Sequence, residues 1–305
     1  MADVGALETP VTATPLPGPA TPVPLLWSSQ FDMASQISGR TYRIYVFQPP
    51  IPAPAAGYPV LVTLDGNMTF PIAATMAAMY AFSMAPTLVV GVGYPTDNPL
   101  EMVRLRVRDL TPETPPERVP NPAGAPPVTA DDIGGADLFR RFLTEELRPV
   151  IAGAHTVDPA RETLFGYSLS GLFTLDAMFK QPGAYRSYVA SSPSIWWNEC
   201  DLLTREAAFV EAVESQTVQP RVLVTVGANE QDAPTRLPPG ETPESAQAMA
   251  DQARMVENAL ELGARLSRLK GGAGYEGRFC AFEDEDHLTC MAAAVGRALD
   301  FALTD

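Results

Sequence analysis

Basic side chains and histidine are scarce in this sequence of 305 residues. Lysine and arginine together number 21 against 36 acidic residues, so the formal net charge is −15, and histidine occurs only 2 times. Proteins bind phosphate backbones largely through clustered lysine and arginine. The composition therefore argues against nucleic acid as a partner, and an anionic membrane surface is disfavoured for the same reason.

Cysteine is also rare, with only Cys200, Cys280 and Cys290 in the chain. An odd number of cysteines without CxxC spacing indicates neither a disulfide framework nor a zinc site, so we expect no metal and a reducing compartment. Buried, unreactive thiols are the favoured interpretation. The alternative is a contact between Cys280 and Cys290, which would lie at the end of a strand and the start of a helix.

Long hydrophobic runs are missing as well. No stretch reaches the ~18 apolar residues that a membrane-spanning helix needs, and the N-terminus lacks the basic region and unbroken apolar segment of a signal peptide. We therefore expect a cytoplasmic protein with no membrane partner. Residues 1–25 are rich in proline, threonine and alanine without periodicity, which predicts an extended or disordered arm before a single domain over residues 26–305.

Alternating strand and helix patterns fill that domain. Residues 27–35 and 40–47 alternate as strands do, and Gly39 between them predicts a turn, so this segment reads as an antiparallel hairpin. Short β-branched runs then predict buried strands, and longer amphipathic segments predict helices between them. The order indicates a mostly parallel, doubly wound sheet with an N-terminal antiparallel hairpin, as in the α/β-hydrolase fold. Strands are expected at 58–66, 87–94, 163–167, 185–191, 221–227 and 275–283, and helices at 71–82, 136–152, 170–180, 244–263 and 288–303.

Two long stretches, 95–135 and 228–243, interrupt this pattern, and each follows the end of a predicted strand. Loops longer than ~15 residues in a compact domain are usually functional lids or disordered segments. In open α/β sheets the site lies at the carboxyl ends of the strands. We therefore expect both stretches to border the site, with 95–135 as a lid or substrate loop.

The segment GYSLSG (166–171) lies directly between a predicted strand and a predicted helix. A nucleophile elbow needs this arrangement, because a tight strand-to-helix turn with small neighbours exposes the serine hydroxyl at the sheet edge. Ser168 occupies the central position and is the predicted nucleophile. Ser170 stands where the usual G-x-S-x-G pattern has its second glycine.

A serine hydroxyl needs an adjacent base, and imidazole suits that task. His155 precedes the nucleophile strand, whereas the fold requires the order serine, acid, histidine along the chain. His287 follows the last predicted strand and begins the last predicted helix, so it is the predicted base. A surface histidine in an acidic loop is the alternative.

The acid of such a triad should follow the strand at 221–227. Both Glu230 and Asp232 qualify there, since either would accept the imidazole N–H and stabilise the imidazolium that forms. We favour Glu230 because it lies nearer the strand end. Asp284 and Asp286, beside His287, are interpreted as solvated charges.

An oxyanion hole needs two backbone donors, one from the residue after the nucleophile and one from the loop after the third strand. Leu169 supplies the first. In LDGNMTF (64–70), Gly66 allows a sharp turn and the amide of Asn67 is the second predicted donor. The alternative for this segment is an ordinary turn formed by Asp65.

These motifs, taken together, resemble the esterase-D-like group of α/β hydrolases, and within it the enterochelin (siderophore) esterase-like hydrolases. The resemblance extends over about residues 58–290. It implies esterase chemistry through a covalent acyl-serine, with no cofactor and no metal. The segments that carry it are YPVLVTLDG, VGVGYPTD, RVRDLTP, GYSLSGLF, ASSPSIWW, VTVGANEQ and EDEDH.

The resemblance also implies a substrate contact for Arg106, the first residue of an RxxDxTP segment whose arginine holds an anionic substrate. Guanidinium grips carboxylate or catecholate oxygens in a bidentate way. Arg104 and Arg108 alternate with Arg106, so on a strand all three would share one face. Solvent-facing arginines that pair with local acids are the alternative.

Aromatic residues follow the strand at 185–191. Trp197, with its neighbour Trp196, is predicted to stack on an aromatic acyl group, and core packing is the alternative. The sequence as a whole favours hydrolysis of a small-molecule carboxylic ester, with siderophore-type lactones as one candidate substrate. An acyltransferase with the same triad and a non-catalytic binding module are the alternatives.

Overall fold

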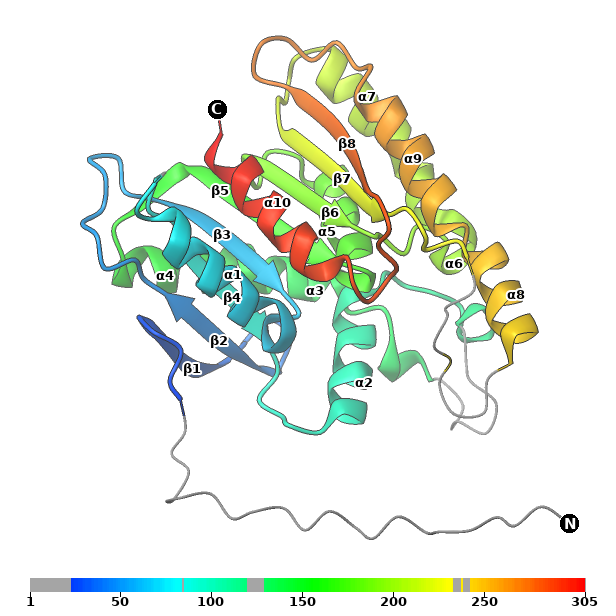
Figure 1. The fold of residues 1–305 in the computed structure, drawn as a ribbon, viewed down its shortest axis with the longest axis horizontal. Helices are drawn as coiled ribbons and strands as arrows, with labels where there is room; N and C mark the ends of the chain where they lie inside the picture. Colours follow the sequence, from blue (N-terminus) through cyan, green and yellow to red (C-terminus); the bar gives the residue numbers. More distant parts are fainter. Residues whose placement is uncertain (1–22, 84, 120–128, 233–236, 238–241, 305) are drawn as a thin grey trace, which may run out of the picture.

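One eight-stranded sheet organises the molecule (Figure 1). The computed structural model describes residues 23–83, 85–119, 129–232, 237 and 242–304, so the expected arm over residues 1–25 lies almost entirely outside the described residues. The strand order is β1-β2-β4-β3-β5-β6-β7-β8. The strands are β1 (Ser28–Ala34), β2 (Thr41–Phe47), β3 (Tyr58–Leu64), β4 (Leu88–Gly93), β5 (Val157–Tyr167), β6 (Ser187–Ser191), β7 (Arg221–Gly227) and β8 (Glu276–Phe282).

The sheet is mostly parallel. β1 pairs with β2, and β2 with β4, in antiparallel orientation, whereas the strands from β4 through β3, β5, β6 and β7 to β8 run parallel. Gly39 closes the first hairpin with a φ of +69°, a conformation that glycine adopts without steric penalty. The mostly parallel sheet with an N-terminal antiparallel hairpin is therefore confirmed.

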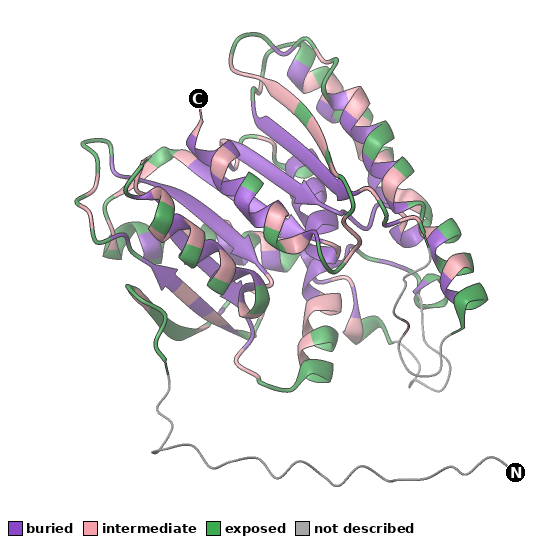
Figure 2. Cartoon of the chain, viewed as in Figure 1, coloured by how far each residue is buried: buried purple, intermediate pink, exposed green. Residues whose placement is uncertain are grey.

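Helices cover both faces of the sheet (Figure 1). Successive residues of a strand point to opposite faces, so Leu61 joins the hydrophobic cluster on one face and Val62 the cluster on the other. The strands between the two layers are largely buried (Figure 2). One face carries α1 (Gly66–Tyr80) and α10 (Met291–Leu303); the other carries α3 (Ala136–Arg141), α4 (Arg148–Ala154), α5 (Leu169–Lys180), α7 (Glu206–Glu214) and α9 (Met255–Leu266).

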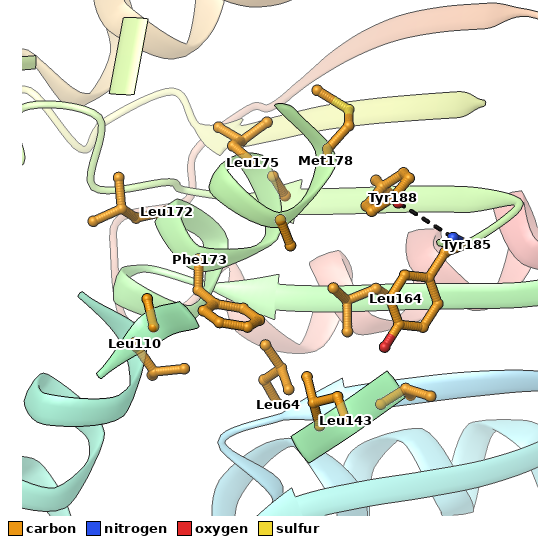
Figure 3. Close-up of a cluster of buried hydrophobic side chains, with 14 of the residues drawn as sticks. Leu64, Leu110, Leu143, Leu164, Leu172, Phe173, Leu175, Met178, Tyr185 and Tyr188 are labelled. Atoms are coloured by element: carbon orange, nitrogen blue, oxygen red, sulfur yellow. Dashed lines mark hydrogen bonds between the residues drawn. The ribbon is translucent and has the colours of Figure 1, made fainter. Parts of the chain in front are cut away.

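Two further helices, α2 (Pro99–Leu110) and α8 (Pro243–Ala253), lie beyond the carboxyl ends of the parallel strands (Figure 1). The C-terminal residue of α2, Leu110, is buried next to Leu172 and Phe173 of α5 (Figure 3). This contact anchors α2 beside the helix that follows the predicted nucleophile.

The expectation of an irregular stretch over 95–135 is wrong for α2. Asn98 caps this helix by accepting the amides of Leu100 and Glu101, and Pro99 occupies the first turn. Both are ordinary helix-start signals. The same stretch also contains the 3₁₀ turns Pro116–Arg118 and Ala130–Asp132, while residues 120–128, 233–236 and 238–241 lie outside the described residues.

Three other boundaries differ from expectation. The single helix expected over 244–263 is wrong, because Arg254 adopts a left-handed φ of 44° and separates α8 from α9. The helix expected over 136–152 contains a π-helical segment, Phe142–Leu147. The last helix begins at Met291 instead of 288. Three helical elements after β6 were not predicted: α6 (Trp197–Cys200), the 3₁₀ turn Asp201–Arg205 and α7.

Candidate active site

Ser168 occupies a sharp turn between β5 and α5. Its φ of 60° and ψ of −120° are rarely adopted by a residue with a side chain. The turn depends on Gly166, because a Cβ at that position would lie 1.9 Å from the carbonyl oxygen of Ser170. This is the strained strand-to-helix geometry of a nucleophile elbow.

Ser168, His287 and Glu230 lie together although they are far apart in the sequence. The imidazole Nε2 of His287 is 3.2 Å from Ser168 Oγ, and its Nδ1 is 2.7 Å from Glu230 Oε2. These three residues follow β5, β8 and β7 respectively, whose parallel arrangement brings their carboxyl ends to one edge. The arrangement has the connectivity of a serine–histidine–acid triad.

The carboxylate of Glu230 is fully enclosed, with no exposed side-chain area. Its Oε1 accepts hydrogen bonds from the Gly227 amide at 2.7 Å, from the hydroxyl of Ser192, and from Cys290 Sγ at 3.3 Å. Burial alone raises the pKa of Glu230, but the hydrogen bonds from His287, Ser192 and Gly227 outweigh burial and hold it below its usual value. Glu230 is therefore an ionised partner for the imidazole.

Asp232, the alternative acid, is exposed to solvent. Its amide donates to the carbonyl of Asn229, which closes a turn after β7. The structure thus brings Glu230, and not Asp232, to His287. Asp286 accepts hydrogen bonds from the amides of Leu288 and Thr289, as a local turn residue.

The two expected oxyanion donors lie at the first turns of two helices. Leu169 is the first residue of α5 and Asn67 the second of α1. The side chain of Asn67 bonds both backbone groups of Tyr94, accepting its amide at 2.8 Å and donating to its carbonyl at 2.9 Å. Gly93 permits this approach, since a Cβ there would lie 2.9 Å from the Asn67 amide nitrogen. The backbone of Asn67 is therefore held against the end of β4.

The arginines of α2 contact neighbouring parts of the chain. The three arginines would share one face on a strand, but they lie on a helix, so Arg104, Arg106 and Arg108 do not share a face. Arg106 forms a bidentate pair with Asp65, with Nε and Nη2 each 2.9 Å from a carboxylate oxygen. Arg104 Nε lies 2.8 Å from Asp132, and Arg108 donates to the carbonyl of Asp131. The geometry supports arginines that pair with local acids.

Trp197 belongs to the core in this structure. Its side chain is buried, and its Nε1 donates to Thr114 Oγ1 at 2.8 Å. Trp196 is half-buried, and its ring centroid lies 5.9 Å from that of Trp197. The structure therefore favours the packing alternative for Trp197 over stacking on a substrate, because the indole is enclosed and its donor is already satisfied.

A family model described as "Putative esterase" matches residues 35–266. The chain belongs to this esterase family. The matched range includes the elbow at Ser168 and the acid at Glu230, and ends within α9, before the strand that leads to His287.

Individual relatives agree with the family. Ferri-bacillibactin esterase BesA of Bacillus subtilis (strain 168) is 34% identical over 280 residues, covering 89% of this chain and 88% of that protein. The siderophore triacetylfusarinine C esterase of Aspergillus fumigatus is 34% identical over 299 residues, covering 93% and 96%. A solved structure of the BES protein from Bacillus cereus has a TM-score of 0.79 at 30% identity, covering 94% of this chain and 100% of that one. The protein is an enzyme, a carboxylic-ester hydrolase of α/β-hydrolase fold.

Three residues of the esterase's site were not assigned a role from the sequence. Ser192, with a φ of 43°, and Cys290 both contact the carboxylate of Glu230. Tyr167 donates to the carbonyl of His287 and lies 3.0 Å from Cys290 Sγ. Ser192 lies within ASSPSIWW and Tyr167 within GYSLSG, but neither segment indicates these contacts, and Cys290 lies in no motif.

The cysteines are free thiols, so the contact considered between Cys280 and Cys290 is not a disulfide. Burial raises the pKa of the Cys290 thiol to about 11, which keeps it protonated and able to donate to Glu230. Among the residues that the structure describes, no helix is long and apolar enough to cross a membrane. The same residues contain no cluster of histidine, cysteine and acidic side chains placed to hold a metal ion.

Proposed function

We propose that this esterase cleaves its substrate through an acyl-enzyme on Ser168, with His287 as general base and Glu230 as the orienting acid. The observation that carries the proposal is the continuous hydrogen-bonded path from Ser168 Oγ through both ring nitrogens of His287 to Glu230. A hydroxyl is a weak nucleophile at its ordinary pKa and needs such a base.

In the acylation half-reaction, Ser168 Oγ attacks the ester carbonyl carbon while Nε2 of His287 takes the hydroxyl proton. Glu230 keeps the imidazole proton on Nδ1 and stabilises the imidazolium. The tetrahedral intermediate then collapses, the bond to the alcohol breaks, and His287 returns the proton to the departing alkoxide oxygen. Water, deprotonated by the same imidazole, releases the acid and restores Ser168.

The negative charge on the carbonyl oxygen is assigned to the amides of Leu169 and Asn67. Helix starts leave amides without intrahelical partners and carry partial positive charge, so α5 and α1 both present suitable donors. Preorganised donors of this kind often make the largest single contribution to acyl transfer.

For the substrate, we propose a siderophore-type ester. Support comes from the relatives, whose names specify ferri-bacillibactin and triacetylfusarinine C as their substrates. Both of these relatives cover most of this chain. Ester bonds within a siderophore are carboxylic esters, so the triad chemistry applies to them without a cofactor.

Hydrolysis of p-nitrophenyl esters from acetate to octanoate, and of ferric and apo catecholate trilactones, tests both parts of the proposal. Ser168→Ala and His287→Ala should each lose at least ~10³-fold in kcat, because triad members act as a unit. The matched control is His155→Ala. The His155 ring contacts the side chain of Gln48 and precedes β5, whereas Ser168 follows β5, so this variant should keep the wild-type rate. Retained activity in Ser168→Ala would overturn the mechanism, and ester hydrolysis without trilactone cleavage would overturn the substrate.

The fate of the acyl group is read in the same assay. Acid product in water, unchanged when a short alcohol is added, is the expected result for a hydrolase. A transferred ester as the main product in the presence of that alcohol would identify an acyltransferase instead. A phosphonate that reacts with serine nucleophiles should lose its leaving group and add the mass of its phosphonyl group to the peptide containing Ser168 and to no other.

A further inference from the structure

Asp65 stands at the start of α1 but does not cap it. An aspartate at this position usually accepts a hydrogen bond from an amide of the first helical turn. Here Asp65 has a left-handed φ of 53° and ψ of 42°, and its side chain makes no capping hydrogen bond. Its carbonyl oxygen accepts the amides of Met68 and Thr69 instead.

The carboxylate of Asp65 is held away from the helix by two other segments. Arg106 of α2 binds both carboxylate oxygens at 2.9 Å, a geometry that fixes position as well as charge. Ser170 of the nucleophile elbow donates to Oδ2 at 2.8 Å. The side chains of Asp65 and Arg106 are only 12% and 22% exposed, so solvent competes weakly for these contacts.

Ser170 is therefore more than a small residue that replaces glycine in the motif. Its hydroxyl is completely buried and accepts the amide of Tyr167 at 2.7 Å. Its single proton lies near two acceptors, the Tyr167 carbonyl and Asp65, and the charged carboxylate is the stronger acceptor. The hydroxyl thus links the elbow, which supplies one oxyanion donor, to the loop that supplies the other.

We propose that Asp65 is a positioning residue for the oxyanion hole, held by Arg106 and Ser170 so that the first amides of α1 stay free for the substrate. This inference rests on the proposed function of Ser168 and the amide of Asn67. A carboxylate that turned back to cap α1 would occupy those amides and place a negative charge where the oxyanion forms. The Arg106 pair prevents this by giving Asp65 a better partner.

This role differs from the substrate contact that the sequence suggested for Arg106. Two of the three guanidinium nitrogens already bond Asp65. An anionic substrate would have to displace Asp65 to gain a bidentate contact with Arg106. Positioning predicts an effect on kcat for every ester, whereas substrate binding predicts an effect on KM for anionic esters alone.

The test compares Arg106→Gln with Arg104→Gln on a neutral ester, p-nitrophenyl butyrate. Arg104 is the matched control, because it lies on the same helix and its side chain is 74% exposed in a pair with Asp132 that does not touch Asp65. Arg106→Gln should lower kcat at least ~10-fold with KM within about threefold, and Arg104→Gln should stay within about twofold of wild type in both. Affinity for a trifluoromethyl ketone, which forms a tetrahedral adduct with the serine, should fall in parallel with kcat.

A double variant separates positioning from general structural damage. In Arg106→Gln the freed Asp65 carboxylate can still turn back to cap α1, whereas in Asp65→Ala/Arg106→Gln no side chain remains at that position to cap the helix. The double variant should recover part of the lost kcat, at least about threefold over Arg106→Gln. Damage to packing alone would leave the double variant equal to or worse than Arg106→Gln.

Two results would overturn the proposal. One is a kcat for Arg106→Gln within about twofold of wild type together with a raised KM for an anionic ester. The other is a folded double variant with no recovery. If Arg106→Gln does not fold, Ser170→Ala provides the same readout, with an expected loss of about threefold or more in kcat and no change in KM; an unchanged kcat would refute the role. Loss of the proposed function is a separate outcome, since it is decided by Ser168→Ala.

Discussion

Replacing Glu230 with glutamine is a sharp test of how the base is oriented, because the amide has the shape of the carboxylate. Oε1 of Glu230 accepts from Gly227, Ser192 and Cys290, while Oε2 contacts His287. Because three groups donate to Oε1, the carbonyl oxygen of the new glutamine should occupy the Oε1 position. The new NH₂ group must then face Nδ1 of His287.

An NH₂ donor opposite Nδ1 forces that nitrogen to be an acceptor, so the ring proton moves to Nε2. Nε2 lies 3.2 Å from Ser168 Oγ and then no longer has a lone pair for the hydroxyl proton. The wrong tautomer of this kind lowers kcat by about 10⁴-fold in serine hydrolases, or about 5 kcal/mol of barrier. We expect Glu230→Gln to fold normally and to lose activity to that extent.

The assay is kcat for p-nitrophenyl butyrate between pH 6 and 9, with the rate of phosphonate labelling of Ser168 measured beside it. Asp232→Asn is the matched control, since Asp232 is exposed, lies two residues away and was the alternative acid. It should stay within about twofold of wild type. A Glu230→Gln enzyme within about tenfold of wild type would refute the reasoning and indicate that Ser168 and His287 work as a dyad.

Three further predictions concern the scaffold. Gly166→Ala should give little soluble, active enzyme, because its Cβ would lie 1.9 Å from the carbonyl oxygen of Ser170. The control Gly153→Ala, whose Cβ would meet nothing within 4 Å, should keep wild-type yield and rate. Normal activity in Gly166→Ala would contradict the elbow geometry. Cys290 should resist iodoacetamide in the native enzyme, since burial raises its pKa to about 11, and peptide mass spectrometry showing full labelling would contradict this. Burial raises the pKa of Asp109 to about 6 despite the nearby Arg40, so the folded state holds the carboxyl proton more tightly than the unfolded chain does. The free energy of unfolding should therefore fall by about 3 kcal/mol as pH rises from about 4 to 6. Asp109→Asn should flatten that dependence in denaturant titrations, and an unchanged slope would refute the assignment.

The parts of the site that depend on local sequence order were predictable. The segment around Ser168 combines a buried strand, small residues and a helix within a dozen positions, so one short window contains the whole elbow. The scarcity of histidine and the chain order required by the fold then indicated His287, which the structure places beside Ser168. The choice between Glu230 and Asp232 needed coordinates, because two residues in one turn differ only in where their side chains point.

Other contacts left no local trace. Ser192 and Cys290 reach Glu230 across 38 and 60 residues of sequence, and neither belongs to a repeating pattern. α2 was missed for a different reason: residues 95–135 were interpreted as one irregular stretch, although Asn98 and Pro99 are helix-start signals. The pairing of Arg106 with Asp65 follows from that helix, so it was out of reach as well.

The proposed base of this esterase, His287, is attached to an edge strand of the sheet. His287 follows β8, which lies at the end of the strand order beside β7 and is mostly half-buried, whereas Ser168 follows β5, an inner strand whose last six residues are buried. Edge strands open by local fluctuations that require less free energy than global unfolding. Heating should therefore abolish catalysis by local unfolding of the β8 edge while Ser168 and most of the hydrophobic core are still native. Residual activity would then report whether that edge is intact, and not whether the whole molecule is folded.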